Sequence, residues 1–111
     1  MATKSKYIFQ THPLLISEDL PALPSELRTA FSEEYRSILS ADPYDCRGFP
    51  NHNLKGRLQD LRTLDIDFAG ISYRLVYRVY EYPAPKRVFV VSFDEHDAAY
   101  DKAKERTGRA K

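Results

Sequence analysis

The chain has 111 residues, 42% of them hydrophobic and 30% charged, and its formal net charge is +1. This length and apolar content predict a single domain over residues 1–111 with a core of its own. The single cysteine excludes an internal disulfide. Because no signal-peptide pattern and no long apolar run is visible, we expect a cytoplasmic protein without a membrane role.

The first half of the chain predicts one strand followed by two helices. Residues 7–10 favour a short strand, and residues 17–23 favour a short helix that Pro21 limits. A longer helix is predicted from Ser25, as N-cap, to the residue before Pro43. Its apolar residues recur at spacings of three and four: Leu27, Ala30, Phe31, Tyr35, Ile38 and Leu39. The two helices together predict a helical hairpin.

The second half predicts a loop, three strands and a final helix. Residues 44–53 are rich in Pro, Gly, Asn and Asp, which is typical of a loop. Residues 63–68, 73–80 and 87–93 read as strands joined by short turns, and residues 98–107 as a helix capped by Asp97. The order β-α-α-β-β-β-α predicts an α+β fold. Its antiparallel sheet would carry the helical hairpin on one face and leave an open concave face on the other.

The strand over residues 73–80 is the most informative segment. Alternate residues of a strand point to the same face. One face would therefore hold Tyr73, Leu75, Tyr77 and Val79, and the other Arg74, Val76, Arg78 and Tyr80. The first set is typical of a core. The second presents two permanent cations on a stiff support, and guanidinium matches phosphate oxygens bidentately. The pattern leaves two interpretations open: a grip on a phosphodiester backbone, or solvated arginines on an exposed face.

Several short motifs, in this order, resemble the RelE/ParE superfamily of bacterial toxins. They are Leu54-Lys55-Gly56 before the three strands, the strand Tyr73-Arg74-Leu75-Val76-Tyr77, and Tyr100 on the last helix. The resemblance extends over residues 7–106 and implies the RelE/ParE-like microbial RNase fold. For the RelE branch it further implies the toxin of a type II toxin–antitoxin system. Such a toxin enters the ribosomal A site and inhibits translation as an mRNA interferase.

The activity implied by this resemblance is endonucleolytic cleavage of mRNA, with the ribosome required. The ribose 2′-hydroxyl attacks the adjacent phosphate and leaves a 2′,3′-cyclic phosphate and a 5′-hydroxyl, without a metal or any other cofactor. This chemistry needs a base, cations for the developing charge and an acid for the leaving oxygen. The implied partners are the ribosome, the mRNA and a cognate antitoxin that covers the same surface.

The resemblance assigns roles residue by residue. Arg74 matches the strand arginine of the family, as the stabiliser of the reacting phosphate. Tyr100 would stack on a base or orient the attacking hydroxyl, and its alternative role is core packing. His96 is the candidate proton donor, because imidazole exchanges protons near neutral pH; otherwise it is a solvated residue at the helix entry. The cations expected to contact RNA, unless they are merely solvated, are Lys55, Arg57 and Arg78.

Two acids depart from the RelE pattern. Where that type carries a pair of lysines, this chain has Asp65 and Asp67. One of them could act as the base, with His96 as the acid. Alternatively, both are structural and form ion pairs with Arg74 and Arg78. Anions beside an RNA phosphate would also weaken binding.

The sequence leaves two other functions open. On the same scaffold, a ParE-like protein would poison DNA gyrase without being an enzyme, and a detoxified homologue would only bind an antitoxin. The histidine and tyrosine of the last helix favour the nuclease, because a gyrase poison needs no acid–base group. His12, His52, His96 and Cys46 show no metal-ligand spacing, so no metal site is predicted.

Overall fold

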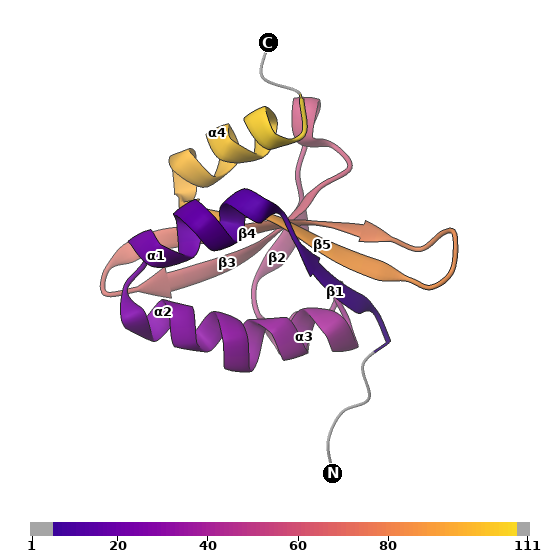
Figure 1. The fold of residues 1–111 in the computed structure, drawn as a ribbon, viewed down its shortest axis with the longest axis horizontal. Helices are drawn as coiled ribbons and strands as arrows, with labels where there is room; N and C mark the ends of the chain where they lie inside the picture. The colour runs from indigo at the N-terminus through magenta and orange to yellow at the C-terminus, as the bar shows by residue number, and fades with distance from the viewer. Residues whose placement is uncertain (1–5, 109–111) are drawn as a thin grey trace.

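The centre of the protein is a five-stranded sheet with the strand order β1-β5-β4-β3-β2. The computed structural model describes residues 6–108 (Figure 1). The strands are β1 (Ile8–Thr11), β2 (Asn51–Asn53), β3 (Arg62–Phe68), β4 (Ile71–Tyr80) and β5 (Arg87–Glu95). The predicted meander is confirmed, because β3, β4 and β5 pair antiparallel in succession. The first strand closes one edge by pairing parallel with β5.

The prediction of a loop over residues 44–53 is wrong for the last three residues. They form β2, which pairs antiparallel with the first half of β3 and closes the second edge of the sheet. This segment, Asn51-His52-Asn53, is wholly polar and therefore carries no alternation of apolar and polar residues. Its strand conformation comes from pairing with β3, which local sequence does not reveal.

The predicted helical hairpin is confirmed, with small changes at its ends. The first helix comprises η1 (Leu15–Asp19) and α1 (Leu20–Ala22), and the second comprises α2 (Ser25–Ala30), η2 (Phe31–Tyr35) and α3 (Arg36–Ala41). Ser25 is the first helical residue and not the N-cap, a position that Pro24 takes without a side-chain bond. No helix in the described part of the chain is long and apolar enough to cross a bilayer.

The last helix, α4 (His96–Arg106), begins two residues earlier than predicted. Strand β5 runs to Glu95, whose backbone is still extended and which takes the N-cap position in place of Asp97. His96 is therefore the first helical residue, and it is held where β5 turns into α4. The backbone then leaves the helix at Gly108, whose φ of +74° suits a residue without a Cβ.

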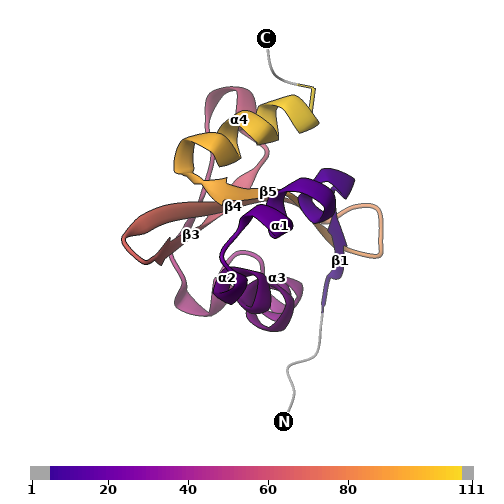
Figure 2. The same cartoon turned by 60° about the vertical axis from the view of Figure 1, so that its left-hand side comes forward.

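Each face of the sheet has a core of its own. Figure 2 shows α2 and α3 on one side of the sheet and α4 on the other. The larger core lies under the helical hairpin and includes Leu27, Phe31, Ile38, Leu64, Tyr73, Leu75, Tyr77 and Phe93. The smaller core lies under α4 and consists of Leu58, Leu61, Val76, Val91, Ala99 and Ala103. The predicted alternation of β4 is confirmed, but its second face, expected to be open, is covered in part by α4.

A buried carboxylate fixes α4 against the rest of the molecule. The side chain of Asp19, fully buried, accepts hydrogen bonds from both terminal nitrogens of Arg106, at 2.7 and 2.8 Å. It also accepts bonds from the Phe93 backbone N–H at 2.9 Å and from Lys102 Nζ at 3.0 Å. Burial alone would raise the pKa of Asp19, but these donors outweigh burial and the pKa is lowered. The first helix of the hairpin, through Asp19 at the end of η1, is therefore joined to α4 by one charged residue.

Candidate functional site

Arg74 lies on the α4 side of the sheet, between acids on both neighbouring strands. In the register it stands opposite Asp65 of β3 and Asp94 of β5. Its Nη1 donates to Ser72 Oγ at 2.7 Å and to the Tyr73 carbonyl at 3.0 Å. Its side chain is only 16% exposed, and its Nε lies 3.2 Å from Asp65 Oδ1. One of the two ion pairs considered from the sequence, Arg74 with Asp65, is therefore present.

The contact between these two charges is not an aligned hydrogen bond. Arg74 Nε and Asp65 Oδ1 are both buried, and neither atom has a hydrogen-bond partner. Charge holds the guanidinium in place while one of its N–H groups still lacks an acceptor, which is uncommon for a buried donor. An anionic oxygen arriving at this face could satisfy that N–H group after a small movement of the side chain.

Asp65 also lies beside a histidine that the sequence did not single out as a site residue. His52 Nδ1 is 3.6 Å from Asp65 Oδ2, and the His52 side chain is 52% exposed. His52 stands opposite Thr63, and Thr63 stands opposite Val76 of β4, so all three share the face of Arg74. The sequence did not predict the contact between His52 and Asp65, because the segment that forms β2 was predicted as a loop. One carboxylate thus lies between an imidazole and a guanidinium.

The second predicted ion pair, Asp67 with Arg78, is wrong. Arg78 Nη1 pairs with Asp60 Oδ2 at 3.1 Å. Asp67 is exposed and lies opposite Ser72, beside the β3–β4 turn. The register explains the difference, since Arg78 lies towards the far end of β4, beyond the last residue that pairs with β3. The two acids of β3 therefore have different surroundings, and Asp65 alone contacts the strand arginine.

His96 and Tyr100 lie side by side on α4, one helical turn apart. Their ring centroids are 4.7 Å apart in an edge-on arrangement. His96 Nδ1 lies 2.8 Å from Asp97 Oδ1. His96 also lines a hollow of about 520 Å³ together with Ser72, the residue that accepts a hydrogen bond from Arg74. The predicted proton donor thus borders a space that reaches Ser72, the hydrogen-bond partner of Arg74, whereas Arg74 itself does not line that space.

The rim of this hollow is acidic. Asp94, Glu95 and Asp97 line it along with His96. Asp94 Oδ2 is neutralised by Lys102 Nζ at 2.7 Å, whereas Asp97 is almost fully exposed. Such a rim would repel a phosphate backbone that approached from the N-terminal end of α4.

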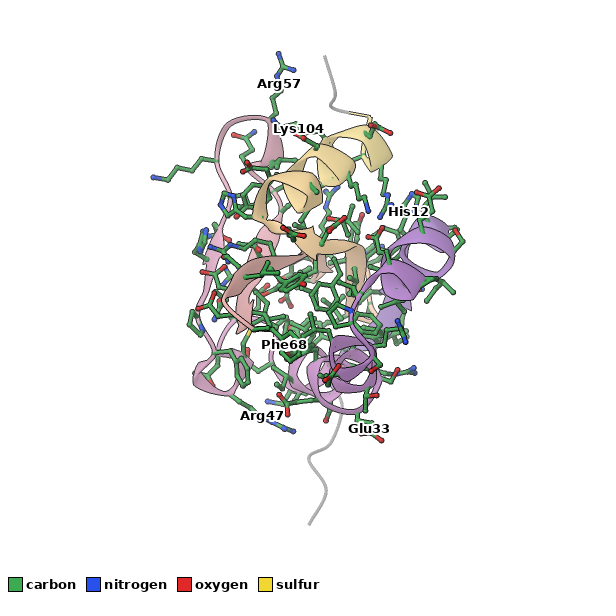
Figure 3. The ribbon with its side chains drawn as sticks, turned by 90° about the vertical axis from the view of Figure 1, so that its left-hand side faces the viewer. His12, Glu33, Arg47, Arg57, Phe68 and Lys104 are labelled. Carbon is green, nitrogen blue, oxygen red and sulfur yellow. The ribbon has the colours of Figure 1, made fainter. Side chains whose placement is uncertain are left out.

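A second hollow, of about 350 Å³, has the opposite character. It is lined by Leu54, Lys55, Arg57, Leu58, Tyr100 and Lys104. Figure 3 shows Arg57 and Lys104 at the same end of the molecule, the first on the short 3-10 helix η4 (Gly56–Leu58) before β3 and the second on α4. The structure therefore brings the predicted Lys55 and Arg57 together with Tyr100. It adds Lys104, a cation that the sequence analysis did not single out as a site residue.

Tyr100 packs against the smaller core and also reaches the candidate site. Its ring is half-buried against the smaller core, and it also lines the basic hollow and touches His96.

Within residues 6–108, no group of three or more His, Cys, Asp or Glu side chains is placed to hold a metal ion. The candidate site is thus a strip of polar groups on the α4 side of the sheet, with cations at one end and acids at the other.

Comparison with known proteins relates this architecture to the fold of a solved toxin structure. No protein-family model and no curated protein sequence matches the chain. Among solved structures, the chain is similar to the E. coli toxin RelE, determined in the free state as a double arginine-to-alanine mutant. The TM-score is 0.62 at 23% sequence identity, over 91% of this chain and 97% of that one. The resemblance noted in the sequence is confirmed at the level of the fold: this chain has the α+β fold of RelE.

Proposed function

We propose that this protein is the toxin of a type II toxin–antitoxin pair and a ribosome-dependent mRNA endonuclease. One observation carries the proposal: Arg74 is held on a central strand of a RelE-like sheet, with imidazole and carboxylate groups on the same face. A rigid strand positions a guanidinium better than a loop would, and charge that develops on a phosphate needs such a fixed donor.

The residues of this face can be given roles in metal-independent cleavage. Arg74 would stabilise the pentacovalent phosphate, with the hydroxyl of Ser72 fixing its guanidinium. His96 would protonate the leaving oxygen. Asp65 would act on the 2′-hydroxyl, either as the base itself or by orienting His52, which lies 3.6 Å from it. Each of these proton transfers requires the RNA to lie across β3 and β4, in front of the start of α4.

The charge distribution suggests how RNA would enter. The acidic rim around His96 disfavours a backbone on that side, whereas Lys55, Arg57 and Lys104 surround the second hollow. RNA would therefore pass from the basic hollow towards Arg74, with Tyr100 offering a ring for base stacking. The cognate antitoxin would block this surface, and the ribosomal A site would supply the correctly placed mRNA.

The acidic rim is also the observation that favours the second candidate function. A protein that binds gyrase, or an antitoxin alone, needs no passage for RNA beside His96, and anions there would do no harm. Inducible expression followed by mapping of cellular mRNA 5′ ends distinguishes these functions. Cuts inside translated codons support the nuclease, whereas intact mRNA together with DNA-damage signalling rejects it in favour of the gyrase poison.

The role of Arg74 is tested by Arg74→Ala in the same expression assay. We expect growth arrest to disappear and the cleavage rate to fall by about 10²–10³, the usual cost of losing one donor to the reacting charge. Arg36→Ala is the matched control, because Arg36 stacks on Phe9 in the helical layer, on the opposite side of the sheet. Melting by circular dichroism confirms that both variants fold. A variant without Arg74 that still arrests translation would refute the assignment.

The role of Asp65 is tested by Asp65→Asn, which keeps the shape of the side chain and removes its charge. If Asp65 takes part in proton transfer, cleavage falls as it does without Arg74. If Asp65 only neutralises Arg74 in the absence of RNA, the variant binds RNA more tightly and cleaves at least as fast. The two interpretations of Asp65 thus predict different cleavage rates for this variant. The rate falls if Asp65 takes part in proton transfer, and it is unchanged or higher if Asp65 only neutralises Arg74.

A further inference from the structure

The outer ends of β4 and β5 carry a cationic patch that the proposed reaction does not use. It consists of Arg78, Tyr80 and Arg87, and we refer to it as the Tyr80 patch. The guanidinium carbons of Arg78 and Arg87 lie 4.7 and 4.4 Å from the centroid of the Tyr80 ring. Tyr80 stands opposite Arg87 in the register, and Arg78 precedes Tyr80 by two residues, so the three side chains share one face.

The charges of the Tyr80 patch are not balanced. Asp60 pairs with Arg78 at 3.1 Å. Within residues 6–108, no carboxylate pairs with Arg87, whose side chain contacts the Tyr80 ring instead. Two guanidinium groups on one ring repel each other, and one carboxylate offsets only one of them. Core packing does not explain the arrangement either, because Val79, between Arg78 and Tyr80, faces the larger core on the opposite side of the sheet.

The position of the Tyr80 patch connects it with the candidate site. Arg74, Arg78 and Tyr80 are alternate residues of one strand, so Tyr80 lies about 20 Å from Arg74 on the same face. The loop that carries Arg57 reaches the patch through the contact of Asp60 with Arg78. Figure 1 shows the β4–β5 hairpin projecting beyond the helices, so α4 does not cover its end. A line of cations therefore runs from the basic hollow to the tip of this face.

We infer that the Tyr80 patch is a second RNA-binding site, which anchors a single-stranded segment away from the reacting phosphate. Arg87 binds a phosphate oxygen there, and an unpaired base stacks against the guanidinium and ring of Arg78 and Tyr80. Guanidinium planes and tyrosine rings are the surfaces on which proteins stack unpaired bases, and such stacking tolerates any base. The inference rests on the proposed function for the identity of the ligand as RNA. The RNA comes either from the message or from the ribosome.

Binding of a 2′-O-methyl oligoribonucleotide, followed by fluorescence anisotropy, tests this site. That oligonucleotide lacks the free 2′-hydroxyl, so binding is measured without cleavage. Tyr80→Ala should weaken binding about 5- to 100-fold, and Tyr80→Phe should retain it, because stacking needs the ring and not the hydroxyl. Arg87→Ala should lower the slope of log affinity against log salt concentration by about 0.7, the effect of one lost phosphate contact. Arg36→Ala, which removes a comparable stacked arginine from α3, should change neither quantity.

Pelleting with salt-washed ribosomes that carry no message distinguishes the two sources of RNA. A defect of the same variants in this assay identifies ribosomal RNA, and a defect with the oligonucleotide alone identifies the message; either result supports the inference. Wild-type affinity of Tyr80→Ala and Arg87→Ala in both assays overturns it. Failure of the proposed function gives a different result, in which the wild-type protein binds RNA through the Tyr80 patch but leaves cellular mRNA intact.

Discussion

Replacing Asp19 by asparagine should destabilise the protein more than any surface substitution. The change preserves the shape of the side chain but leaves the guanidinium of Arg106, only 3% exposed, without its buried counter-charge. Breaking a buried ion pair by removing one partner costs roughly 3–5 kcal/mol. For a domain of this size, 1 kcal/mol corresponds to about 4 °C in melting temperature, so Asp19→Asn should lower it by roughly 12–20 °C. Thermal unfolding at pH 7, followed by circular dichroism, measures this shift.

Glu18 provides the matched control for this prediction. It is the neighbouring acid and also contacts Arg106, but at 3.5 Å and with a side chain that is 58% exposed. Solvent screens such a pair, so Glu18→Gln should cost less than about 1 kcal/mol. Equal effects of the two substitutions would refute the reasoning, because they would mean that burial of the pair does not matter.

The pH dependence of stability gives an independent check on Asp19. Its pKa is lower in the folded protein than the ordinary value of 3.8, so the folded state favours the charged form. The stabilisation is therefore complete above the ordinary value and is lost as the pH falls through the pKa of the folded state. The difference in unfolding free energy between the wild type and Asp19→Asn should shrink in strong acid. A difference that stays constant from pH 7 to pH 2 would contradict the assignment.

Two further predictions concern proton transfer and tyrosine ionisation. His96→Gln should lower the single-turnover cleavage rate by about 10²–10⁴, the usual contribution of a general acid. A parallel measurement on His52→Gln shows whether His52 also takes part in cleavage. An unchanged rate for His96→Gln would make His96 a solvated helix-entry residue. Burial and a hydrogen bond of 2.5 Å to the Glu81 carboxylate raise the pKa of Tyr44 to about 12. Ultraviolet titration of the wild type and of Tyr44→Phe should therefore find that Tyr44 ionises well above pH 10. Glu81→Gln should lower the midpoint of this ionisation. Ionisation of Tyr44 near pH 10 in the wild type would exclude the hydrogen bond to Glu81.

Several features of the fold could be predicted because they depend on local periodicity. Alternation in β4 placed Tyr73, Leu75 and Tyr77 in one core and Val76 on the other face, as the structure has them. The apolar stripe from Leu27 onward gave the long helix, and the short turns between three strands gave the antiparallel meander. The motifs around Arg74 added the resemblance to RelE, which the similarity in fold confirms. Each of these signals repeats within a few residues and requires no knowledge of distant parts of the chain.

The partners of the charged side chains could not be predicted in the same way. Asp19 and Arg106 are 87 positions apart in the sequence, and Arg78 pairs with Asp60 where the sequence suggested Asp67. A strand with no apolar residue, β2, brings His52 beside Asp65.

The sequence by itself determined the main elements apart from β2, the fold class and the arginine that the proposed reaction needs. Tertiary structure alone decided which acid faces that arginine, how far α4 covers the second face and where the cations gather. The physical reason lies in the range of the interactions. Apolar residues that are buried recur at a regular spacing in the sequence. An ion pair, by contrast, needs only two residues anywhere in the chain that strand register and chain reversal bring within about 4 Å of each other.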